Sequence, residues 1–334
     1  MIKLAINGFG RIGRCAFKIA LTKKNSQVAA INDLTDTRTL AYLLRYDSAY
    51  GRYGNKVSYD AKNIIVDGKK YPIFAEKDPS KLPWKKLGVD VVMECTGVFD
   101  KKEDLALHLK AGAKKVVLSA PAKDEVQTLV FGTELTKKTL GKNDKIISNA
   151  SCTTNCISPV MQILHSVYGV EKAIMTTVHA YTASQKLVDG PDSKDPRRGR
   201  AGAANMAPST TGAAKATILT IPELKDKFDG ISIRVPVICG SLSDITAILK
   251  KNTTVEEINK TFEKYASHPM YKNILGITGP DDELTSTDII GTTQSAIIDL
   301  KFTRVVGGNL VKILAWYDNE WGYSNRLVEM SLAV

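Results

Sequence analysis

Two cysteines four residues apart are the clearest candidates for chemistry in this 334-residue sequence. Cys152 and Cys156 lie in the segment SNASCTTNC (148–156), which follows the apolar pair Ile146-Ile147. If a helix begins in this segment, the two sulfurs lie about one turn apart on the same face of that helix. Such a pair could bind a metal, form a disulfide, or consist of one nucleophile and one bystander.

The metal interpretation is weak because a zinc site needs about four ligands at suitable spacing. The sequence has no C-x-x-C motif and only four histidines, and five cysteines without a disulfide-dense pattern fit a reducing compartment. Cys15, Cys95 and Cys239 lie among apolar or small residues and are expected to be buried. Cys152 is the candidate nucleophile, because the start of a helix is expected to lower a thiol pKa, and Cys156 is its neighbour inside the helix.

A nucleophilic thiol needs a base, and histidine is the usual choice. His108 and His165 lie in helix-like stretches and His268 in a polar turn, where a surface position is the default expectation. His179 ends the strand-like segment KAIMTTVHAYT (172–182) and precedes a long polar loop. A histidine is more often structural, but His179 paired with Cys152 would make a nucleophile and its base.

A glycine-rich turn near the N-terminus predicts a second functional element. Strand-like KLAING (3–8) leads into a segment of helical periodicity, and VAAIND (28–33) reads as the next strand. The junction carries G-x-G-x-x-G, which allows a tight turn and close approach of the backbone to a pyrophosphate at a helix N-terminus. An acidic residue ending the second strand can bind ribose hydroxyls. This context predicts a dinucleotide site formed by Gly8, Gly10, Gly13 and Asp33.

Three more segments read as buried parallel strands, namely 89–99, 114–122 and 145–151. Their ends belong at the ligand crevice, which makes Thr96, Gly97 and Ser119 candidate cofactor contacts. After residue 156 the strands read as a mixed sheet. The sequence therefore predicts an α/β protein with a Rossmann-type doubly wound dinucleotide-binding domain and an α+β catalytic domain with a mixed or antiparallel sheet. The expected domains are 1–150 plus a C-terminal helix 317–334, and 151–316.

The formal net charge of +11 raises nucleic acid as a partner. The lysines occur as scattered pairs without an aromatic stripe or a nucleic-acid-binding motif, so a solvated basic surface that attracts small anions is the favoured interpretation. No apolar run is long enough to span a bilayer, and the first residues lack the features of a secretory signal. We expect a cytoplasmic protein without membrane partners, in which nucleic-acid binding is at most a secondary activity.

Several motifs together resemble phosphorylating glyceraldehyde-3-phosphate dehydrogenase over essentially the whole chain. They are NGFGRIGR, ASCTTNC, HAYT, PSTTGAAKA, RVPV and WYDNEWGYSNR. The resemblance implies NAD-dependent oxidation and phosphorylation of D-glyceraldehyde 3-phosphate to 1,3-bisphosphoglycerate. It implies that Cys152 attacks the aldehyde to give a thiohemiacetal and later a thioester, with His179 as the base. It implies no metal.

The resemblance also implies two phosphate sites and further cofactor contacts. The substrate phosphate site maps onto Thr182, Arg234 and a loop arginine, taken as Arg198 although Arg197 is the alternative. The inorganic phosphate site maps onto Ser151, Thr153, Thr211 and Gly212, beside Cys152. Further expected NAD contacts are Arg11, Ile12, Lys77, Asn319 and Tyr323.

Two other interpretations stay open at this point. An NAD-dependent semialdehyde dehydrogenase would also use a cysteine and a histidine after a dinucleotide domain, but would not depend on phosphate. Binding to RNA or display at a surface is the second, motivated by the charge alone. Members of the resembled family are usually homotetramers, which the sequence does not itself establish.

Overall fold

The computed structural model describes residues 1–141, 144–193 and 195–334, which fall into two compact units. The first unit comprises Met1–Leu129, Thr139–Ala150 and Ser324–Val334. The second comprises Val130–Lys138 and Ser151–Tyr323. No helix in the described ranges is both long and apolar enough to cross a membrane.

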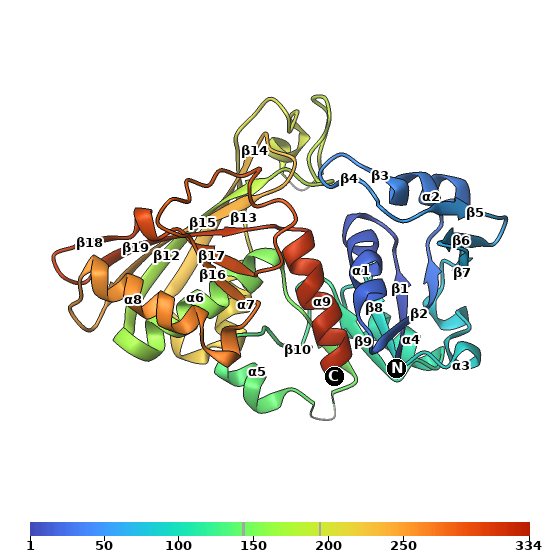
Figure 1. Ribbon diagram of the computed structural model, residues 1–334, viewed down its shortest axis with the longest axis horizontal. Coiled ribbons are helices and arrows are strands. Elements are labelled where there is room, and N and C mark those ends of the chain that lie inside the picture. The colour runs from blue at the N-terminus through green and yellow to red at the C-terminus, as the bar shows by residue number, and fades with distance from the viewer. Residues whose placement is uncertain (142–143, 194) are drawn as a thin grey trace. The chain divides into compact units, whose positions relative to one another are not determined.

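The first unit is built on a nine-stranded sheet (Figure 1). Its strands from β10 to β7 run parallel, whereas β7, β6 and β5 pair in an antiparallel manner. Strands β1 and β8 are short and largely buried, as the apolar runs predict for a parallel sheet. In spatial order the strands are β10 (Gln127–Thr128), β11 (Ile146–Ser148), β9 (Lys115–Leu118), β8 (Val91–Glu94), β1 (Ile2–Asn7), β2 (Ser26–Asn32), β7 (Lys69–Phe74), β6 (Asn63–Val66) and β5 (Val57–Tyr59).

The helices of this unit connect the strands along the chain. They are α1 (Arg11–Thr22), α2 (Thr37–Arg45), α3 (Trp84–Leu87) and α4 (Lys102–Lys110), together with the 3₁₀ turn η1 (Pro79–Lys81) and the small hairpin β3 (Tyr46–Asp47) and β4 (Gly51–Arg52). Helix α5 (Glu134–Thr139) lies almost wholly in the second unit.

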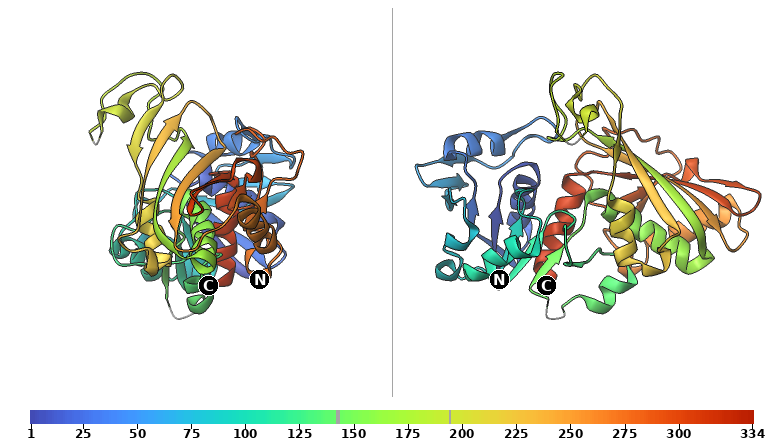
Figure 2. Two further views of the ribbon diagram at one scale, coloured as in Figure 1. Left: turned by 90° about the vertical axis from the view of Figure 1, so that its left-hand side faces the viewer. Right: turned by 180° about the vertical axis from the view of Figure 1, so that it is seen from behind.

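The second unit contains an eight-stranded mixed sheet, which can be followed in Figure 2. Strands β12 and β14 are parallel, and β15 and β19 run antiparallel to their neighbours. The order is β13 (Ala207–Thr210), β14 (Phe228–Val235), β12 (Val170–Ala180), β15 (Ser241–Leu249), β19 (Leu310–Tyr317), β17 (Ala296–Ile298) and β16 (Leu275–Ile277), with β18 (Arg304–Val306) also on β19. The other elements are α6 (Cys152–Tyr168), α7 (Ala213–Thr220), α8 (Val255–Ala266), η2 (Pro196–Gly199), η3 (Pro222–Leu224), η4 (Pro269–Tyr271), η5 (Leu300–Phe302) and α9 (Trp321–Ala333), which ends in the first unit.

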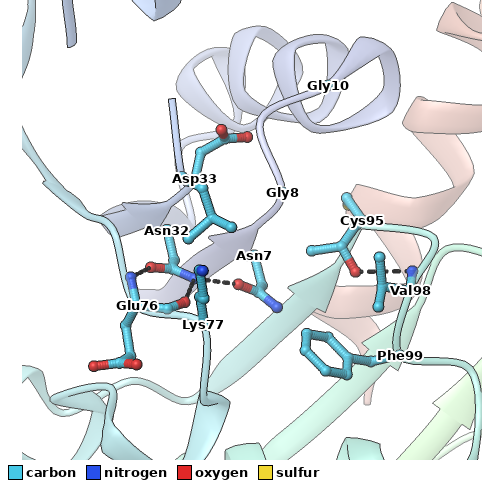
Figure 3. A pocket seen from close by; sticks show the side chains of 12 residues that line it. Asn7, Gly8, Gly10, Asn32, Asp33, Glu76, Lys77, Cys95, Val98 and Phe99 are labelled. Atoms are coloured by element: carbon cyan, nitrogen blue, oxygen red, sulfur yellow. Dashed lines mark hydrogen bonds between the residues drawn. The ribbon is translucent and has the colours of Figure 1, made fainter. Parts of the chain in front are cut away.

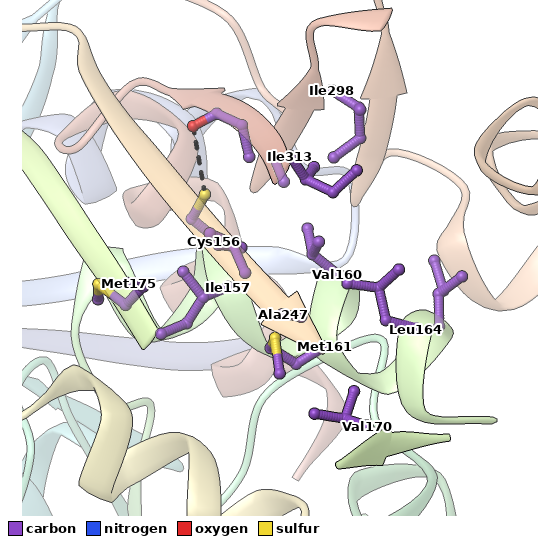
Figure 4. Packing of buried hydrophobic residues seen from close by; sticks show 14 of the residues in the cluster. Cys156, Ile157, Val160, Met161, Leu164, Val170, Met175, Ala247, Ile298 and Ile313 are labelled. Carbon is purple, nitrogen blue, oxygen red and sulfur yellow. Dashed lines mark hydrogen bonds between the residues drawn. The ribbon is translucent and has the colours of Figure 1, made fainter. Parts of the chain in front are cut away.

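The core of the second unit lies between its sheet and helix α6 (Figure 4). Cys156, Val160 and Leu164 recur at helical spacing and are fully buried. Strand β15 alternates buried and half-buried residues, so that Ala247 and its same-face neighbours meet the helix side. Each fully buried large apolar side chain stabilises the unit by about 1.5–3 kcal/mol relative to exposure. This packing holds the first turn of α6 in one place relative to the strands.

The observed units differ from the expected domains at the C-terminus. The expected helix 317–334 begins only at Trp321, because Tyr317 still belongs to strand β19 and is buried. Asp318 directly follows the strand, and its carboxylate accepts from the backbone N–H of Trp321 at 2.7 Å, where the helix starts. The chain returns to the first unit only at Ser324, and the segment 130–138 belongs to the second unit. The division of roles between the domains stays a prediction.

Candidate active site

The glycine turn between β1 and α1 forms one wall of a pocket in the first unit (Figure 3). Gly8 has a positive φ of 90°, and a Cβ there would lie 2.6 Å from the backbone nitrogen of Thr96. A Cβ on Gly13 would lie 2.0 Å from the carbonyl oxygen of Gly8. Both positions therefore exclude a side chain, and helix α1 starts at Arg11, directly beyond the turn, so that its N-terminus points its backbone N–H groups toward this side.

Asp33 follows strand β2 and faces the same pocket. Its carboxylate accepts from the backbone N–H of Phe9 at 2.7 Å and from that of Thr35 at 2.9 Å. These two bonds hold the carboxylate beside the glycine turn, where an acidic group can accept from ribose hydroxyls. The pocket thus combines a helix N-terminus, which can bind a pyrophosphate, with a carboxylate that can accept hydrogen bonds from ribose hydroxyls. Both features fit a dinucleotide.

The expected cofactor residues divide into three groups. Gly8, Gly10, Asp33, Lys77 and Thr96 line the pocket. Arg11, Ile12, Gly13, Gly97 and Ser119 lie in adjoining segments of the same unit but not among its lining residues, and the guanidinium of Arg11 is held by Asp47 at 2.7 Å. Asn319 and Tyr323 belong to the second unit, where the amide oxygen of Asn319 accepts from the hydroxyl of Ser241 at 2.9 Å.

Sequence reasoning missed seven lining residues, and the ends of parallel strands were the signal that could have found some of them. Asn7 ends β1 and Asn32 ends β2, whereas Cys95 directly follows β8. The missed residues are Asn7, Asn32, Leu34, Glu76, Cys95, Val98 and Phe99.

The second candidate site is built at the first turn of helix α6. Ser151 is the N-cap, and its hydroxyl accepts from the backbone N–H of Thr154 at 3.0 Å. Cys152 is consequently the first helical residue, as expected from the sequence. Cys156 is fully buried one turn later, and its sulfur lies 3.8 Å from the carbonyl oxygen of Ala315. All five cysteines are free, so the disulfide interpretation is excluded and Cys156 is the bystander.

The structure brings His179 to Cys152, with 3.4 Å between Nε2 and the sulfur. The other ring nitrogen, Nδ1, lies 2.7 Å from the carbonyl oxygen of Ala180. The neutral ring has two tautomers: Nδ1 can donate to this carbonyl, or it can accept from Nη1 of Arg234, which is 2.6 Å away. In the first tautomer the lone pair of Nε2 faces the thiol. Burial, reinforced by the positive charge of Arg234, lowers the pKa of His179 to about 3. The imidazole is therefore neutral at pH 7 and able to accept a proton.

The pKa of Cys152 differs from the sequence expectation. Burial raises the pKa of the thiol, and the opposing effects of Arg234 and the bonds at the start of the helix do not overcome it. The expectation of a lowered pKa was wrong because it considered the helix terminus and not the loss of water around the sulfur. The pair consequently consists of a thiol and a neutral imidazole.

Tyr317 supports this pair from strand β19. Its hydroxyl bonds to the hydroxyls of Thr153 at 2.9 Å and Thr177 at 2.8 Å. Its ring meets the ring of His179 edge-on, with 6.0 Å between the centroids. One buried tyrosine therefore ties the helix that carries Cys152 to the strand that carries His179.

The expected phosphate ligands all lie in the second unit. Arg234 on β14 stands beside His179, with 2.6 Å between Nη1 and Nδ1. Burial lowers the pKa of Arg234, and the positive charge of Arg198 adds to that lowering, whereas Arg197 is exposed and paired with Asp195 at 3.1 Å. These two observations favour Arg198 over Arg197 as a neighbour of the site.

The hydroxyl-bearing candidates have local partners. Thr182 follows β12, and its backbone N–H donates to the side chain of Gln185 at 2.8 Å. The hydroxyl of Thr211 accepts from the backbone N–H of Ala213 at 3.2 Å. Gly212 is exposed and is the N-cap of α7. Thr211 and Gly212 therefore stand at a helix start, where a small anion can be bound.

The remaining histidines have other surroundings. His108, expected at the surface, is fully buried, because its ring bonds to Trp84 at 3.0 Å and lies 3.1 Å from Glu94. His165 accepts from the backbone N–H of Val170 at the end of α6. Within the described residues, no group of three or more His, Cys, Asp and Glu side chains is arranged to hold a metal ion.

The fold and the two sites define a class: nucleotide-binding enzymes in which a cysteine and a histidine are in contact at the start of a helix. Residues 2–102 match the family described as glyceraldehyde 3-phosphate dehydrogenase, NAD binding domain, and residues 151–319 match the C-terminal domain of the same enzyme. The chain belongs to the glyceraldehyde-3-phosphate dehydrogenase family, and its cofactor is NAD.

Relatives named glyceraldehyde-3-phosphate dehydrogenase match over nearly their whole length. The protein from Thermotoga maritima is 53% identical over 331 residues, which cover 98% of each chain. The protein from Borreliella burgdorferi is 51% identical over 336 residues, which cover 99% of this chain and 98% of the relative. The protein from Geobacillus stearothermophilus is 48% identical over 330 residues, which cover 99% and 97%.

Proposed function

We propose that the protein oxidises and phosphorylates D-glyceraldehyde 3-phosphate to 1,3-bisphosphoglycerate, with NAD reduced to NADH. The observation that carries this proposal is the distance of 3.4 Å between the sulfur of Cys152 and Nε2 of His179. The family match and the names of the relatives point to the same reaction.

The first step is attack of the Cys152 sulfur on the aldehyde carbon. A C–S bond forms, the thiol proton passes to Nε2 of His179, and His179 returns it to the carbonyl oxygen, which becomes the hydroxyl of a thiohemiacetal. The low pKa of His179 keeps the imidazole neutral before the attack, and we assign the tautomer with its proton on Nδ1, where it can be donated to the carbonyl of Ala180. Direct transfer within the pair is needed because the raised pKa of Cys152 leaves little thiolate in advance.

The cofactor pocket fits NAD, because the glycine turn admits a close backbone approach and Asp33 offers a carboxylate for ribose hydroxyls. Bound NAD would accept the hydride, which carries the two electrons lost in the oxidation. We assign Gly8, Gly10, Asp33, Lys77 and Thr96 to its binding. Asn319, Tyr323 and the other expected contacts rest on the resemblance alone.

Oxidation leaves a thioester on Cys152, which an oxygen of inorganic phosphate attacks, so that the C–S bond breaks and the thiolate is released. We assign Arg198, Arg234 and Thr182 to the phosphate group of the substrate. We assign Ser151, Thr153, Thr211 and Gly212 to the attacking phosphate. Guanidinium groups, hydroxyls and free N–H groups at a helix start are suited to these anions.

The test is NADH formation from glyceraldehyde 3-phosphate and NAD, with and without phosphate, in the wild type and in two variants. Cys152→Ser should abolish turnover. Cys156→Ala, the matched control, should retain it because Cys156 faces the core. Turnover that is indifferent to phosphate would refute the thioester route and favour a semialdehyde dehydrogenase type of reaction instead.

We also propose a homotetramer, on the evidence of exposed apolar side chains on one face of the sheet of the second unit. Ile174 on β12 and Ile231 on β14 are 59% and 49% exposed and share this face. Exposed apolar side chains gathered on one face are typical of subunit interfaces. Light scattering after size exclusion would give the mass, and a monomer would refute the proposal. Five free thiols fit a cytoplasmic location.

A further inference from the structure

A buried hydrogen-bond network lies behind the dinucleotide pocket and converges on Glu94. Glu94 ends strand β8 and is fully buried, as is His108 on α4. Four donors reach its carboxylate. Oε1 accepts from the backbone N–H of Thr96 at 2.7 Å and from its hydroxyl at 2.5 Å, and Oε2 lies 2.5 Å from Nδ2 of Asn7 and 3.1 Å from Nε2 of His108.

One arm of the network has its donor direction set by Trp84. The indole N–H can only donate, and it donates to Nδ1 of His108 at 3.0 Å. Nδ1 is consequently unprotonated, so the ring proton lies on Nε2 and points to Oε2 of Glu94. His108 thus presents a donor to Glu94 and cannot accept from it while this arm is intact.

The other arm has its direction set by the backbone of Glu76. The N–H of Glu76 donates to the amide oxygen of Asn32, and the carbonyl of Glu76 accepts from Nδ2 of Asn32, both at 2.9 Å (Figure 3). Nδ2 of Asn32 also donates to the amide oxygen of Asn7 at 2.7 Å. The amide of Asn7 is therefore oriented with Nδ2 toward Oε2 of Glu94.

The donors of Asn7 and His108 require an acceptor at Oε2 of Glu94, and those of Thr96 require an acceptor at Oε1. An ionised carboxylate accepts at both oxygens, whereas an amide has one acceptor atom only. The network reaches the pocket from the ends of four neighbouring strands, β8, β1, β2 and β7, since Thr96, Asn7, Asn32 and Glu76 all line it. Thr96 is also the residue against which Gly8 packs without room for a Cβ.

We propose that Glu94 is a positioning residue of the cofactor pocket, whose buried carboxylate fixes side chains and backbone that line it at the ends of β8, β1, β2 and β7. The inference rests on the proposed function in that the pocket binds NAD. Glu94 acts through Thr96 and Asn7 and is not itself among the residues that line the pocket.

The test is Glu94→Gln, which keeps the shape and replaces one acceptor by a donor. In one orientation of the glutamine amide the new NH₂ group takes the place of Oε2 and faces the donors of Asn7 and His108; in the other it takes the place of Oε1 and faces the two donors of Thr96. In either case two donors oppose each other, and the residues that line the pocket must shift. We expect the Kd for NAD, measured by calorimetry, to rise about tenfold or more. The KM for NAD should rise in parallel, whereas the KM for glyceraldehyde 3-phosphate should change little. Glu103→Gln, an exposed position on α4, is the matched control.

A rescue variant separates positioning from simple stability. The double variant Asn7→Asp with Glu94→Gln exchanges the carboxylate and the amide between the two residues, which are in contact at 2.5 Å. An oxygen at the former Nδ2 position could accept from the new amide and from Nε2 of His108, which is 3.4 Å away. We expect the double variant to regain most of the NAD affinity, although Asn7→Asp alone opposes two carboxylates and should lose it.

The outcomes are distinct. A wild type that binds no NAD would overturn the proposed function itself. Wild-type binding with an unchanged Kd in Glu94→Gln, even at a lowered Tm, would overturn the positioning role alone. Tighter binding in Glu94→Gln would show that the charge of Glu94 only repels the anionic cofactor, and would also overturn it. If Glu94→Gln does not fold, the double variant decides, and its failure to fold or to bind would refute the donor pattern.

Discussion

Replacing His179 by asparagine would test the base in the proposed mechanism. The amide of asparagine can donate to the carbonyl of Ala180, which lies 2.7 Å from Nδ1, but it cannot take up a proton in place of Nε2. The substitution therefore removes the proton acceptor that lies 3.4 Å from the sulfur of Cys152 and preserves its neighbouring contact.

The size of the effect follows from the state of the thiol. A cysteine with an ordinary pKa of about 8.5 is roughly 3% thiolate at pH 7, and the raised pKa of Cys152 makes that fraction smaller. Without a base, attack depends on this fraction. A positioned general base contributes about 10²–10⁴-fold, so we expect kcat/KM for the aldehyde to fall by that factor at pH 7.

The assay is kcat/KM for glyceraldehyde 3-phosphate between pH 6 and pH 9. In the His179→Asn variant it should rise about tenfold per pH unit, because each unit increases the thiolate fraction tenfold below the thiol pKa. The wild type should rise less steeply, since His179 accepts the proton directly. A variant with wild-type activity at pH 7, or with a profile parallel to that of the wild type, would refute the assignment of His179 as the base.

Three further outcomes are expected. The pKa of His179 is about 3 in the folded protein and about 6.5 when unfolded, so its contribution to stability is present above pH 6.5 and is lost as the pH falls toward 3. In denaturant titrations the unfolding free energy of the wild type should therefore fall by about 2 kcal/mol between pH 7 and pH 5, and that of His179→Asn should not show this loss. Gly8→Ala places a Cβ 2.6 Å from the backbone of Thr96 at a positive φ, and should lower the unfolding free energy by about 1–3 kcal/mol and weaken NAD binding; unchanged calorimetry and Tm would contradict this. Arg198→Ala should raise the KM for glyceraldehyde 3-phosphate about tenfold through loss of a charged hydrogen bond, whereas Arg197→Ala should leave it unchanged because that side chain pairs with Asp195 at the surface; the reverse result would exchange the two assignments.

Local patterns were sufficient for the elements that carry the two sites. The glycines of the turn, the apolar runs on either side and Asp33 predicted a strand, a turn, a helix and a second strand, and the structure has them within a few residues. Ser151 before Cys152 likewise starts a helix where the sequence indicates one. These features follow from sterics, capping and hydrophobic periodicity, which act over a few residues and are visible in the sequence.

The pairing of side chains distant in the sequence required the tertiary structure. His179 and Cys152 are 27 residues apart, and only the packing of α6 on the sheet brings them to 3.4 Å. The direction of the Cys152 pKa shift was missed for the same reason, since burial is a property of the surrounding fold and outweighs the local helix start.

His108 illustrates the difference most clearly. Its helix, with a charged first turn, predicts a surface side chain, yet the ring is buried between Trp84 and Glu94, which come from two other elements. The sequence determines where strands end, where glycine is required and which residue types are available for catalysis. Which of those residues lose water, meet a partner and change their proton affinity is decided by contacts between distant segments, because desolvation and hydrogen-bond partners exist only once the chain has folded.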